Sequence, residues 1–235
     1  MKNPLAVITG GTKGIGKALI EKFASDGFQI ATCARNESEL QKLKSEIKEK
    51  YNVSVHTFSC DLSLRNHIAD FLEFVQMIGE PVEILINNTG IFIPGEILKE
   101  EEGMLEKMMH TNVYSAYHVS RGIVPLMVGH QKAYIFNMCS IASFMAYANG
   151  GSYAITKFAL LGMSKVLREE LKQTGIRVSS VMPGATYTPS WESSGVEETR
   201  LMKAEDIADI IFASYHLSSR AVVEDIIIRP QLGDL

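Results

Sequence analysis

Tyr153 and Lys157 lie four residues apart, a spacing that places two side chains about one turn apart on one face of a helix. The stretch from about Tyr153 to Gln173 is predicted to form that helix. An ammonium group beside a phenol favours the phenolate and lowers the phenol pKa from about 10. A phenol tuned in this way can exchange a proton with a carbonyl or alcohol oxygen near neutral pH. The pair therefore predicts proton transfer at a C=O or C–OH group, and Ser140, thirteen residues before Tyr153, is a candidate partner.

A glycine-rich segment, residues 9–16, follows the first apolar run and opens a helix-like stretch. Glycines allow a tight turn and a close approach of backbone to a pyrophosphate, and a helix N-terminus offers free N–H groups. A turn that merely needs positive φ is the structural alternative. The strand–turn–helix context favours dinucleotide binding. The residues expected at the cofactor here are Gly10, Thr12, Lys13, Gly14, Ile15 and Gly16.

A second motif overlaps this segment. Gly11, Gly16 and Lys17 match most of a phosphate-binding loop of ATP- and GTP-binding proteins. The next residue is Ala18, which has no hydroxyl to bind magnesium, and no acid follows the fourth strand-like run. The pattern disfavours an ATP- or GTP-binding protein.

The end of the second strand-like run bears on the choice of nicotinamide cofactor. An NAD site usually has an acid there for the ribose 2′-hydroxyl, whereas an NADP site uses Arg near the 2′-phosphate. This chain has Ala34 followed by Arg35, with Lys13 as a second cation, and Glu37 fits the first turn of the next helix better. A solvated surface cation is the alternative for Arg35. We expect NADP(H) to be preferred over NAD(H).

Short β-branched runs alternate with amphipathic stretches along the whole chain. Several runs are almost entirely apolar, as expected for strands covered on both faces, and the alternation predicts a parallel sheet with right-handed crossovers. We expect one domain over residues 1–235, with no linker. The predicted strands are 4–9, 28–34, 53–59, 82–87, 133–139, 176–182 and 222–228. The predicted helices lie near 15–25, 37–50, 63–78, 99–109, 112–128, 152–173 and 204–218. The acidic stretch 96–107 is interpreted as an exposed helix start with a solvated face.

Polar and glycine residues stand where the predicted strands end. Since ligands bind at the carboxyl edge of such sheets, these residues predict one cleft along that edge. They are Gly10, Arg35, Asp61, Asn87, Asn88, Ser140, Pro183 and Gly184.

Composition narrows the class of protein. The 46% apolar fraction allows a large core, and a net charge of -4 without a Lys/Arg stripe argues against nucleic acid as the main partner. We found no apolar run of 18 residues and no signal peptide, so we expect a cytoplasmic protein without a membrane partner. The three cysteines and six histidines show no metal or disulfide spacing, and we expect no metal site.

Together these motifs resemble the short-chain dehydrogenase/reductase family over essentially the whole chain, and the sequence is broadly similar to sepiapterin-reductase-like and bacterial carbonyl-reducing members. The resemblance implies a Rossmann-type doubly wound parallel sheet of about seven strands in three α/β/α layers. It also implies NAD(P)-dependent carbonyl/alcohol chemistry and a homodimer or homotetramer. The matching residues are Thr9, Gly10, Gly14, Ile15, Gly16, Asp61, Asn87, Asn88, Thr89, Gly90, Asn112, Ser140, Tyr153, Lys157, Pro183, Gly184 and Thr188.

The resemblance also implies roles for these positions. Tyr153 would be the general acid/base, Lys157 would hold the nicotinamide ribose, and Ser140 would donate a hydrogen bond to the substrate oxygen. Asn112 would shape a helix and fix a water that relays protons to the Lys. Local caps or turns are the alternatives for Ser140, Asn112 and Asp61. Further cofactor contacts are expected from Asp61 and Leu62 at the adenine, from Asn87 and Gly90 on the adenosine side, from Asn88 beside the central strand, and from Pro183, Gly184, Thr186 and Thr188 near the nicotinamide.

Two features depart from the family pattern. Thr89 stands where Ala is usual in Asn-Asn-x-Gly, and a buried Thr hydroxyl needs a partner. The C-terminus, residues 228–235, lacks the glycine pair common in members that act on acyl-carrier thioesters or steroids. This puts substrate analogy with those members in doubt.

The substrate pocket is expected from segments 91–95, 141–149 and 185–203. The side chains there are mostly apolar, which suits a small, fairly apolar carbonyl or alcohol. The segment 185–203, with Ser193 and Ser194, is expected to close over the cofactor, whereas Phe144 and Trp191 could equally pack a lid or a subunit interface. The substrate-contacting residues are expected to include Ser140, Met145, Tyr147, Tyr153 and Trp191. A non-catalytic NADP(H)-binding sensor or scaffold is the alternative function, and the complete set of Ser140, Tyr153, Lys157 and Asn112 argues against it.

Overall fold

A computed structural model describes residues 3–130, 132–191 and 195–234. Within these residues the chain forms a seven-stranded sheet in the order β3-β2-β1-β4-β5-β6-β7, and all neighbouring strands are parallel. Each predicted strand is present, with its ends within three residues of those expected. The strands are β1 Leu5–Thr9, β2 Gln29–Ala34, β3 Val55–Ser59, β4 Val82–Asn87, β5 Tyr134–Met138, β6 Arg177–Pro183 and β7 Asp225–Ile228.

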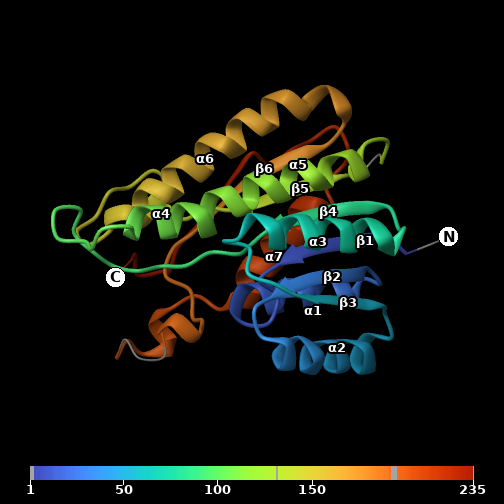
Figure 1. Cartoon of the computed structure of the whole chain (residues 1–235), viewed down its shortest axis with the longest axis horizontal. Coiled ribbons are helices and arrows are strands. Elements are labelled where there is room, and N and C mark those ends of the chain that lie inside the picture. The colour runs from blue at the N-terminus through green and yellow to red at the C-terminus, as the bar shows by residue number, and fades with distance from the viewer. Residues whose placement is uncertain (1–2, 131, 192–194, 235) are drawn as a thin grey trace.

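Helices cover both faces of this sheet (Figure 1), and the prediction of a three-layer Rossmann-type fold is confirmed. Residues of α1, α2 and α7 share one buried core, whereas residues of α3, α5 and α6 share the other. The helices are α1 Gly14–Ser25, α2 Glu37–Tyr51, α3 Arg65–Ile78, α4 Met104–Met109, α5 Ser115–Met127, α6 Gly151–Leu171 and α7 Ala204–Tyr215.

The strands are apolar because helices cover both faces of the sheet. In β1, Ala6 and Ile8 enter the core under α1, while Leu5 and Val7 enter the core under α3 and α5. Successive strand side chains point to opposite faces, so a strand with helices on both sides must be apolar at every position. All five residues of β1 are buried.

The region between β4 and α5 differs from the prediction. The acidic stretch forms turns, and the helix begins at Met104 instead of near residue 99, after Gly103 with a φ of 86°. The two predicted helices are one continuous helical segment, because a π-helical turn, His110–Tyr114, joins α4 to α5. Single π turns of this kind frequently occur at functional sites.

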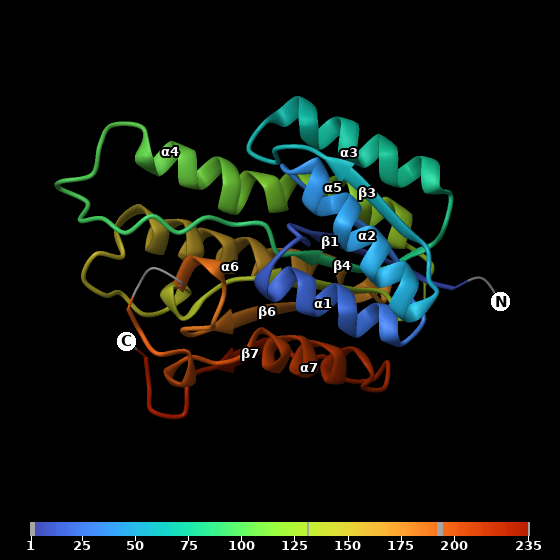
Figure 2. The ribbon, with the colours of Figure 1, turned by 90° about the horizontal axis from the view of Figure 1, so that it is seen from below.

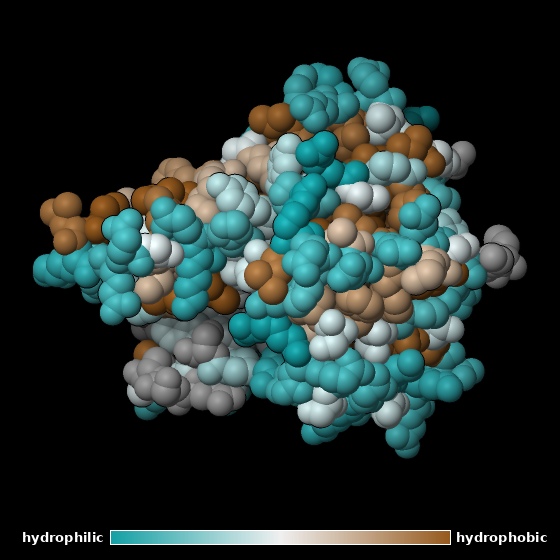
Figure 3. Space-filling view, viewed as in Figure 1, coloured by the Kyte–Doolittle hydropathy of each residue, from teal (hydrophilic) through white to brown (hydrophobic). Residues whose placement is uncertain are grey.

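The strand order places β1 between β2 and β4, so the chain reverses its direction of winding there. Ligands of doubly wound sheets bind in the crevice outside the carboxyl ends of the strands at such a point. Figure 2 shows the segment 88–103 and the described parts of 186–203 extending beyond the same end of the sheet. The segment 88–103 carries the exposed Ile97 and Leu98, and Figure 3 shows apolar surface at the end of the molecule where it lies.

Candidate active site

A cleft of about 930 Å³ runs along the carboxyl ends of β1, β2, β3 and β4. Its walls come from the glycine-rich loop, the ends of β2 and β3, the segment after β4 and two residues of the predicted substrate loop. Most of the residues predicted to bind the cofactor are among them. They are Gly10, Thr12, Lys13, Gly14, Ile15, Gly16, Arg35, Asp61, Leu62, Asn88, Gly90 and Thr188.

The glycine loop fits a dinucleotide diphosphate. Gly10 and Gly14 have φ of 68° and 51°, which side chains rarely adopt. A Cβ on Gly16 would lie 2.2 Å from the Gly10 carbonyl oxygen, so only glycine lets the loop close against α1. The N-terminus of α1 has no side-chain cap and no acid in its first turn. Its backbone N–H groups therefore face the cleft as a site for an anion.

The end of β4 is joined to the end of β1. Asn88 Nδ2 donates to the carbonyl oxygens of Thr9 at 2.9 Å and Gly10 at 3.0 Å, while the backbone N–H groups of Asn88 and Thr89 donate to Thr9 Oγ1. The Thr89 side chain fits here because Gly10 has no side chain. A Cβ on Gly10 would lie 3.0 Å from Thr89 Oγ1. These bonds hold the floor of the cleft.

Asn87 does not line the cleft, contrary to the prediction that it lies at the adenosine. Its side chain is buried and donates to Ser120 Oγ at 2.9 Å and Asn137 Oδ1 at 2.8 Å. Adjacent strand residues point to opposite sides, so Asn87 faces the helices while the chain turns at Asn88.

Asp61 lines the cleft beyond β3. Its Oδ1 accepts from the Ser63 backbone N–H at 2.9 Å, and α3 begins only at Arg65, so Asp61 shapes the turn instead of capping the helix. Burial alone would raise the pKa of the Asp61 carboxyl. The hydrogen bonds from Ser63 and the positive charge of Arg35 outweigh burial, and the net pKa is lowered. Asp61 is therefore an ionised acceptor at neutral pH.

Lys13 is not an uncompensated cation. Its Nζ lies 2.8 Å from Glu39 Oε1, and Glu39 also lines the cleft. The hydrogen bond from Lys13 lowers the pKa of Glu39. Glu39 was not predicted at the site, because only the position of α2 beside the glycine loop reveals the contact. Arg35 is exposed at the cleft wall, beside Asn36, which caps α2 by accepting from the Glu39 N–H.

The predicted catalytic side chains meet where β5 ends and α6 begins. Ser140 lies two residues after the end of β5, and its Oγ accepts from the Ala142 N–H at 3.1 Å. The Ser140 side chain also lies near the Tyr153 phenol, where it acts to lower the pKa of that phenol. Ser140 thus caps a short 3₁₀ turn, Ile141–Ser143, and also contacts the predicted acid/base. The two interpretations of Ser140 are compatible.

Lys157 lies on the same face of α6 as Tyr153. Its Nζ is 5.6 Å from the Tyr153 ring centroid and donates to the Met138 carbonyl oxygen at 2.7 Å. Burial lowers the pKa of Lys157 to about 8.

Burial also raises the pKa of the Tyr153 phenol, and the neighbouring Ser140 side chain offsets this only in part. The prediction that Lys157 lowers the phenol pKa is therefore wrong for this structure, in which desolvation dominates. The phenol is protonated at neutral pH, ready to act as an acid.

Asn112 lies inside the π-helical turn and is buried, so it is not a helix cap. Its Oδ1 accepts from the Ile91 N–H at 2.7 Å, and its Nδ2 donates to the Ile91 carbonyl at 3.0 Å and to Thr156 Oγ1 at 3.0 Å. Asn112 therefore ties the segment after β4 to α6, one residue before Lys157.

The cleft ends at this cluster. Gly90 and Ile91 line the cleft, and a Cβ on Gly90 would lie 3.3 Å from Asn112 Oδ1 and 3.7 Å from Lys157 Nζ. A dinucleotide whose diphosphate lies on the glycine loop would therefore extend toward Tyr153 and Lys157.

The region next to Tyr153 is aromatic. Phe92 packs its ring edge-to-face on Tyr153, with 4.8 Å between centroids, and is half exposed. Tyr147 and Met145 are also partly exposed, and burial raises the pKa of Tyr147 to about 12, with a smaller effect from Tyr153. Trp191 lies in a 3₁₀ turn, Pro189–Trp191, of the substrate loop. Ser193 and Ser194 of that loop lie outside the described residues.

Besides Asn87, five residues predicted at the cofactor are not among those that line the cleft: Tyr153, Lys157, Pro183, Gly184 and Thr186. Thr186 is buried, and its hydroxyl donates to the Gly184 carbonyl at 3.0 Å. A Cβ on Gly184 would lie 2.4 Å from Asp234 Oδ1, so the C-terminal residues pack against this turn. Thr188 lines the cleft but lies against the glycine loop: a Cβ on Gly14 would be 2.9 Å from Thr188 Cγ2.

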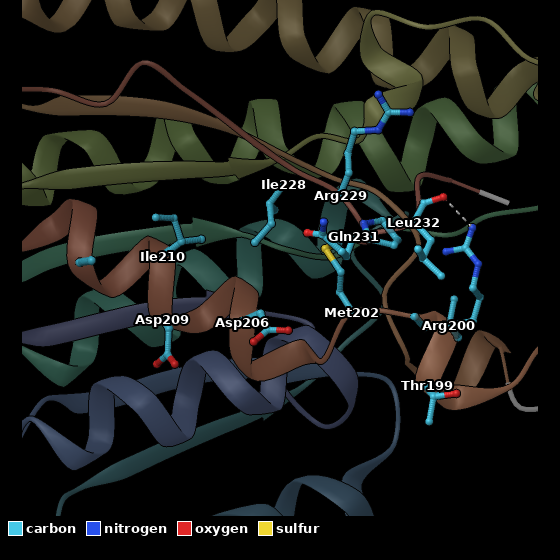
Figure 4. A pocket seen from close by; sticks show the side chains of 13 residues that line it. Thr199, Arg200, Met202, Asp206, Asp209, Ile210, Ile228, Arg229, Gln231 and Leu232 are labelled. Atoms are coloured by element: carbon cyan, nitrogen blue, oxygen red, sulfur yellow. Dashed lines mark hydrogen bonds between the residues drawn. The ribbon is translucent and has the colours of Figure 1, made fainter.

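A second hollow, of about 660 Å³, lies between α7, the end of β7 and the C-terminal residues (Figure 4). Arg200, in the substrate loop, donates to the carbonyl oxygens of Gly233 at 2.9 Å and Leu232 at 3.3 Å. Among the described residues that line it, none comes from the glycine loop or the Ser140–Tyr153–Lys157 cluster. This hollow belongs to the attachment of the C-terminal residues to the loop.

The described part of the chain contains no cluster of three or more metal-ligating His, Cys, Asp or Glu residues. It also contains no helix with the length and apolarity needed to cross a membrane. Cys33, Cys60 and Cys139 are buried free thiols.

A Rossmann-type sheet, a glycine-rich dinucleotide cleft and an adjoining Ser–Tyr–Lys cluster define a class of oxidoreductase. The family model described as short chain dehydrogenase matches residues 4–199. The chain belongs to the short-chain dehydrogenase/reductase family.

Named relatives include a tropinone reductase homolog from Arabidopsis thaliana, 37% identical over 194 residues, with 82% of this chain and 73% of the relative covered. Sepiapterin reductase from Chlorobaculum tepidum is 29% identical, with 98% of each chain covered. Among solved structures, L-sorbose reductase from Gluconobacter frateurii in complex with NADPH and L-sorbose superposes with a TM-score of 0.88. It is 26% identical, with 97% of this chain and 95% of that chain covered.

Proposed function

We propose that the protein is an NADP(H)-dependent oxidoreductase that interconverts a carbonyl and an alcohol on a small, fairly apolar substrate, with Tyr153 as general acid/base. The observation that carries this proposal is the position of Tyr153. Its phenol lies close enough to Ser140 for that side chain to act on the phenol pKa, and its ring centroid is 5.6 Å from the Nζ of Lys157, which reaches the cleft at Gly90. A sensor or scaffold would have no need of this cluster.

The cofactor would be held by the residues that line the cleft. The glycine loop and the N-terminus of α1 would bind the diphosphate, and Asp61 and Leu62 would flank the adenine. Lys157 would reach the nicotinamide ribose, and Thr188 would close over the glycine loop. The bound nicotinamide would supply or accept the hydride.

Tyr153 and Ser140 would have different roles at the substrate oxygen. In reduction, the protonated Tyr153 phenol gives its proton to the oxygen as negative charge develops there. Ser140 donates a hydrogen bond to the same oxygen and so stabilises that charge. In oxidation, the proton moves in the opposite direction. Asn112 positions Ile91 and α6 around the pair through its hydrogen bonds.

The preference for NADP(H) rests on Arg35, an exposed cation at the cleft wall where an NAD site has an acid. The complex of L-sorbose reductase with NADPH supports it. Glu39 opposes a preference for NADP(H), since its negatively charged carboxylate lies on the same wall of the cleft as Arg35.

Arg35→Asp is expected to raise the NADPH Kd at least about tenfold relative to the NADH Kd, whereas Glu39→Gln is the matched charge control and should not weaken NADPH. Both are measured by fluorescence titration. Unchanged NADPH selectivity in Arg35→Asp would remove Arg35 from the 2′-phosphate site.

The substrate preference rests on the aromatic rings of Phe92 and Tyr147 next to Tyr153, to which we add the expected contacts of Met145 and Trp191. A panel of benzaldehyde, cyclohexanone and diacetyl, followed by NADPH absorbance, tests the reaction class. Turnover of at least one compound is expected. NADPH binding without turnover on a broad panel of aldehydes, ketones and diketones would favour the scaffold. We further propose that the protein is cytoplasmic and forms a homodimer or homotetramer. Sedimentation of the purified protein would test the oligomeric state.

A further inference from the structure

One acid of the stretch 96–107 turns inward, although the stretch was expected to form a solvated face. Glu96, Glu101 and Glu102 are exposed, but Glu100 is partly buried against the N-terminus of α6. Its Oε1 accepts from the Ser152 backbone N–H at 2.9 Å, and its Oε2 accepts from the Ser152 hydroxyl. The two residues are 52 positions apart, so the contact belongs to the tertiary structure.

Two glycines make room for the Glu100 side chain. A Cβ on Gly151 would lie 2.0 Å from Glu100 Oε1, and a Cβ on Gly95 would lie 2.7 Å from Glu100 Cγ. The Gly95 N–H donates to the Asn149 carbonyl at 3.0 Å, which joins the two loops at their base. The carboxylate is therefore enclosed by two segments shaped around it.

Helix α6 needs such a partner. It begins without a side-chain cap from its own N-cap residue, Gly150, and without an acid in its first turn. The first backbone N–H groups of a helix have no partner within the helix, and a carboxylate there satisfies them and complements the helix dipole. Ser152, which receives this contact, directly precedes Tyr153.

We propose that Glu100 is a positioning residue for the reaction: it caps α6 from a distant segment and so holds the Tyr153 phenol against Ser140. This inference rests on the proposed function of Tyr153. Loss of the carboxylate lets the first turn of α6 fray, which displaces the phenol from the substrate oxygen. A small displacement of a catalytic group is enough to lower the rate strongly.

Three variants test the proposal: Glu100→Ala, Glu100→Gln, which keeps one acceptor oxygen, and Glu101→Ala as the exposed neighbour. The rate is measured with whichever of benzaldehyde, cyclohexanone or diacetyl the wild type reduces fastest. We expect Glu100→Ala to lower kcat by about 10- to 100-fold with the NADPH Kd within about twofold. Glu100→Gln should regain most of the loss, and Glu101→Ala should match the wild type.

Hydrogen exchange and a double mutant separate positioning from a general loss of stability. A peptide over residues 150–158 should exchange about tenfold faster in Glu100→Ala, with α1 unchanged. Adding Glu100→Ala to Tyr153→Phe should cause little further loss of rate. Unchanged exchange over 150–158, a wild-type kcat in Glu100→Ala, or additive losses in the double mutant would each overturn the proposal. A fully active Tyr153→Phe would instead overturn the proposed function, while the exchange result would still test the cap.

Discussion

Replacing Lys157 by methionine is expected to stabilise the folded protein at neutral pH while abolishing turnover. The Lys157 ammonium is buried and has the Met138 carbonyl oxygen as its hydrogen-bond acceptor, at 2.7 Å. Such a site keeps a charge where the reaction needs it, at a cost in stability. Methionine has a similar length and no charge, so it removes that cost together with the function.

The expected gain in the free energy of unfolding follows from the pKa of Lys157, which burial lowers from 10.5 to about 8. This difference corresponds to about 3 kcal/mol against the charged form. Loss of the hydrogen bond to Met138 costs about 1 kcal/mol, so the variant should gain about 2 kcal/mol, or roughly 4–8 °C in Tm.

The stability difference between Lys157→Met and the wild type should decrease as the pH rises. Below pH about 8 both the folded and unfolded states carry the proton, and the full cost is present. Between about 8 and 10.5 the unfolded state binds more protons than the folded state, so wild-type stability rises with pH and the difference shrinks.

Urea unfolding followed by far-UV circular dichroism, at about pH 6.5 and about pH 9.5 and without cofactor, measures this difference. The gain should be present at the lower pH and near zero at the higher pH. Lys48→Met, at an exposed position of α2, serves as a control with an expected change below about 0.5 kcal/mol. A destabilised Lys157→Met, or a gain that does not change with pH, would refute a costly buried ammonium.

Two further substitutions test the parts that surround the pair. Asn112→Ala leaves the Ile91 backbone groups without their side-chain partner and should lower the free energy of unfolding by about 2–4 kcal/mol; a change below about 1 kcal/mol in urea unfolding would contradict this. Gly16→Ala places a Cβ 2.2 Å from the Gly10 carbonyl oxygen and should weaken NADPH binding at least about tenfold in a fluorescence titration. Wild-type affinity in Gly16→Ala would show that the loop does not close as described.

The fold was largely predictable because its signals are local and repeated. Runs such as Leu5–Thr9 are apolar at every position, and only strands covered on both faces need that pattern. The π turn at His110–Tyr114 was not predictable in the same way. It requires no particular residue type, and its side-chain hydrogen bonds, such as Ser115 Oγ to the Thr111 carbonyl, appear only once the helix is formed.

The candidate site was predictable where a motif specifies backbone geometry, as in the glycine loop. It was less predictable where a side chain has a choice of partners. Lys13 was expected to serve the cofactor, and it pairs with Glu39, which α2 brings beside the loop. The Tyr153 pKa was misjudged for a related reason: helical spacing shows that Lys157 is near, but not that desolvation of the phenol dominates its pKa.

The central claim is that the Tyr153 phenol delivers the proton in an NADP(H)-dependent reduction. Tyr153→Phe tests it most directly, because the ring that packs on Phe92 is kept and only the hydroxyl is lost. Single-turnover reduction with pre-bound NADPH is predicted to slow by about 10²- to 10⁴-fold, with the NADPH Kd within about twofold of the wild type. A single-turnover rate close to that of the wild type would contradict the account.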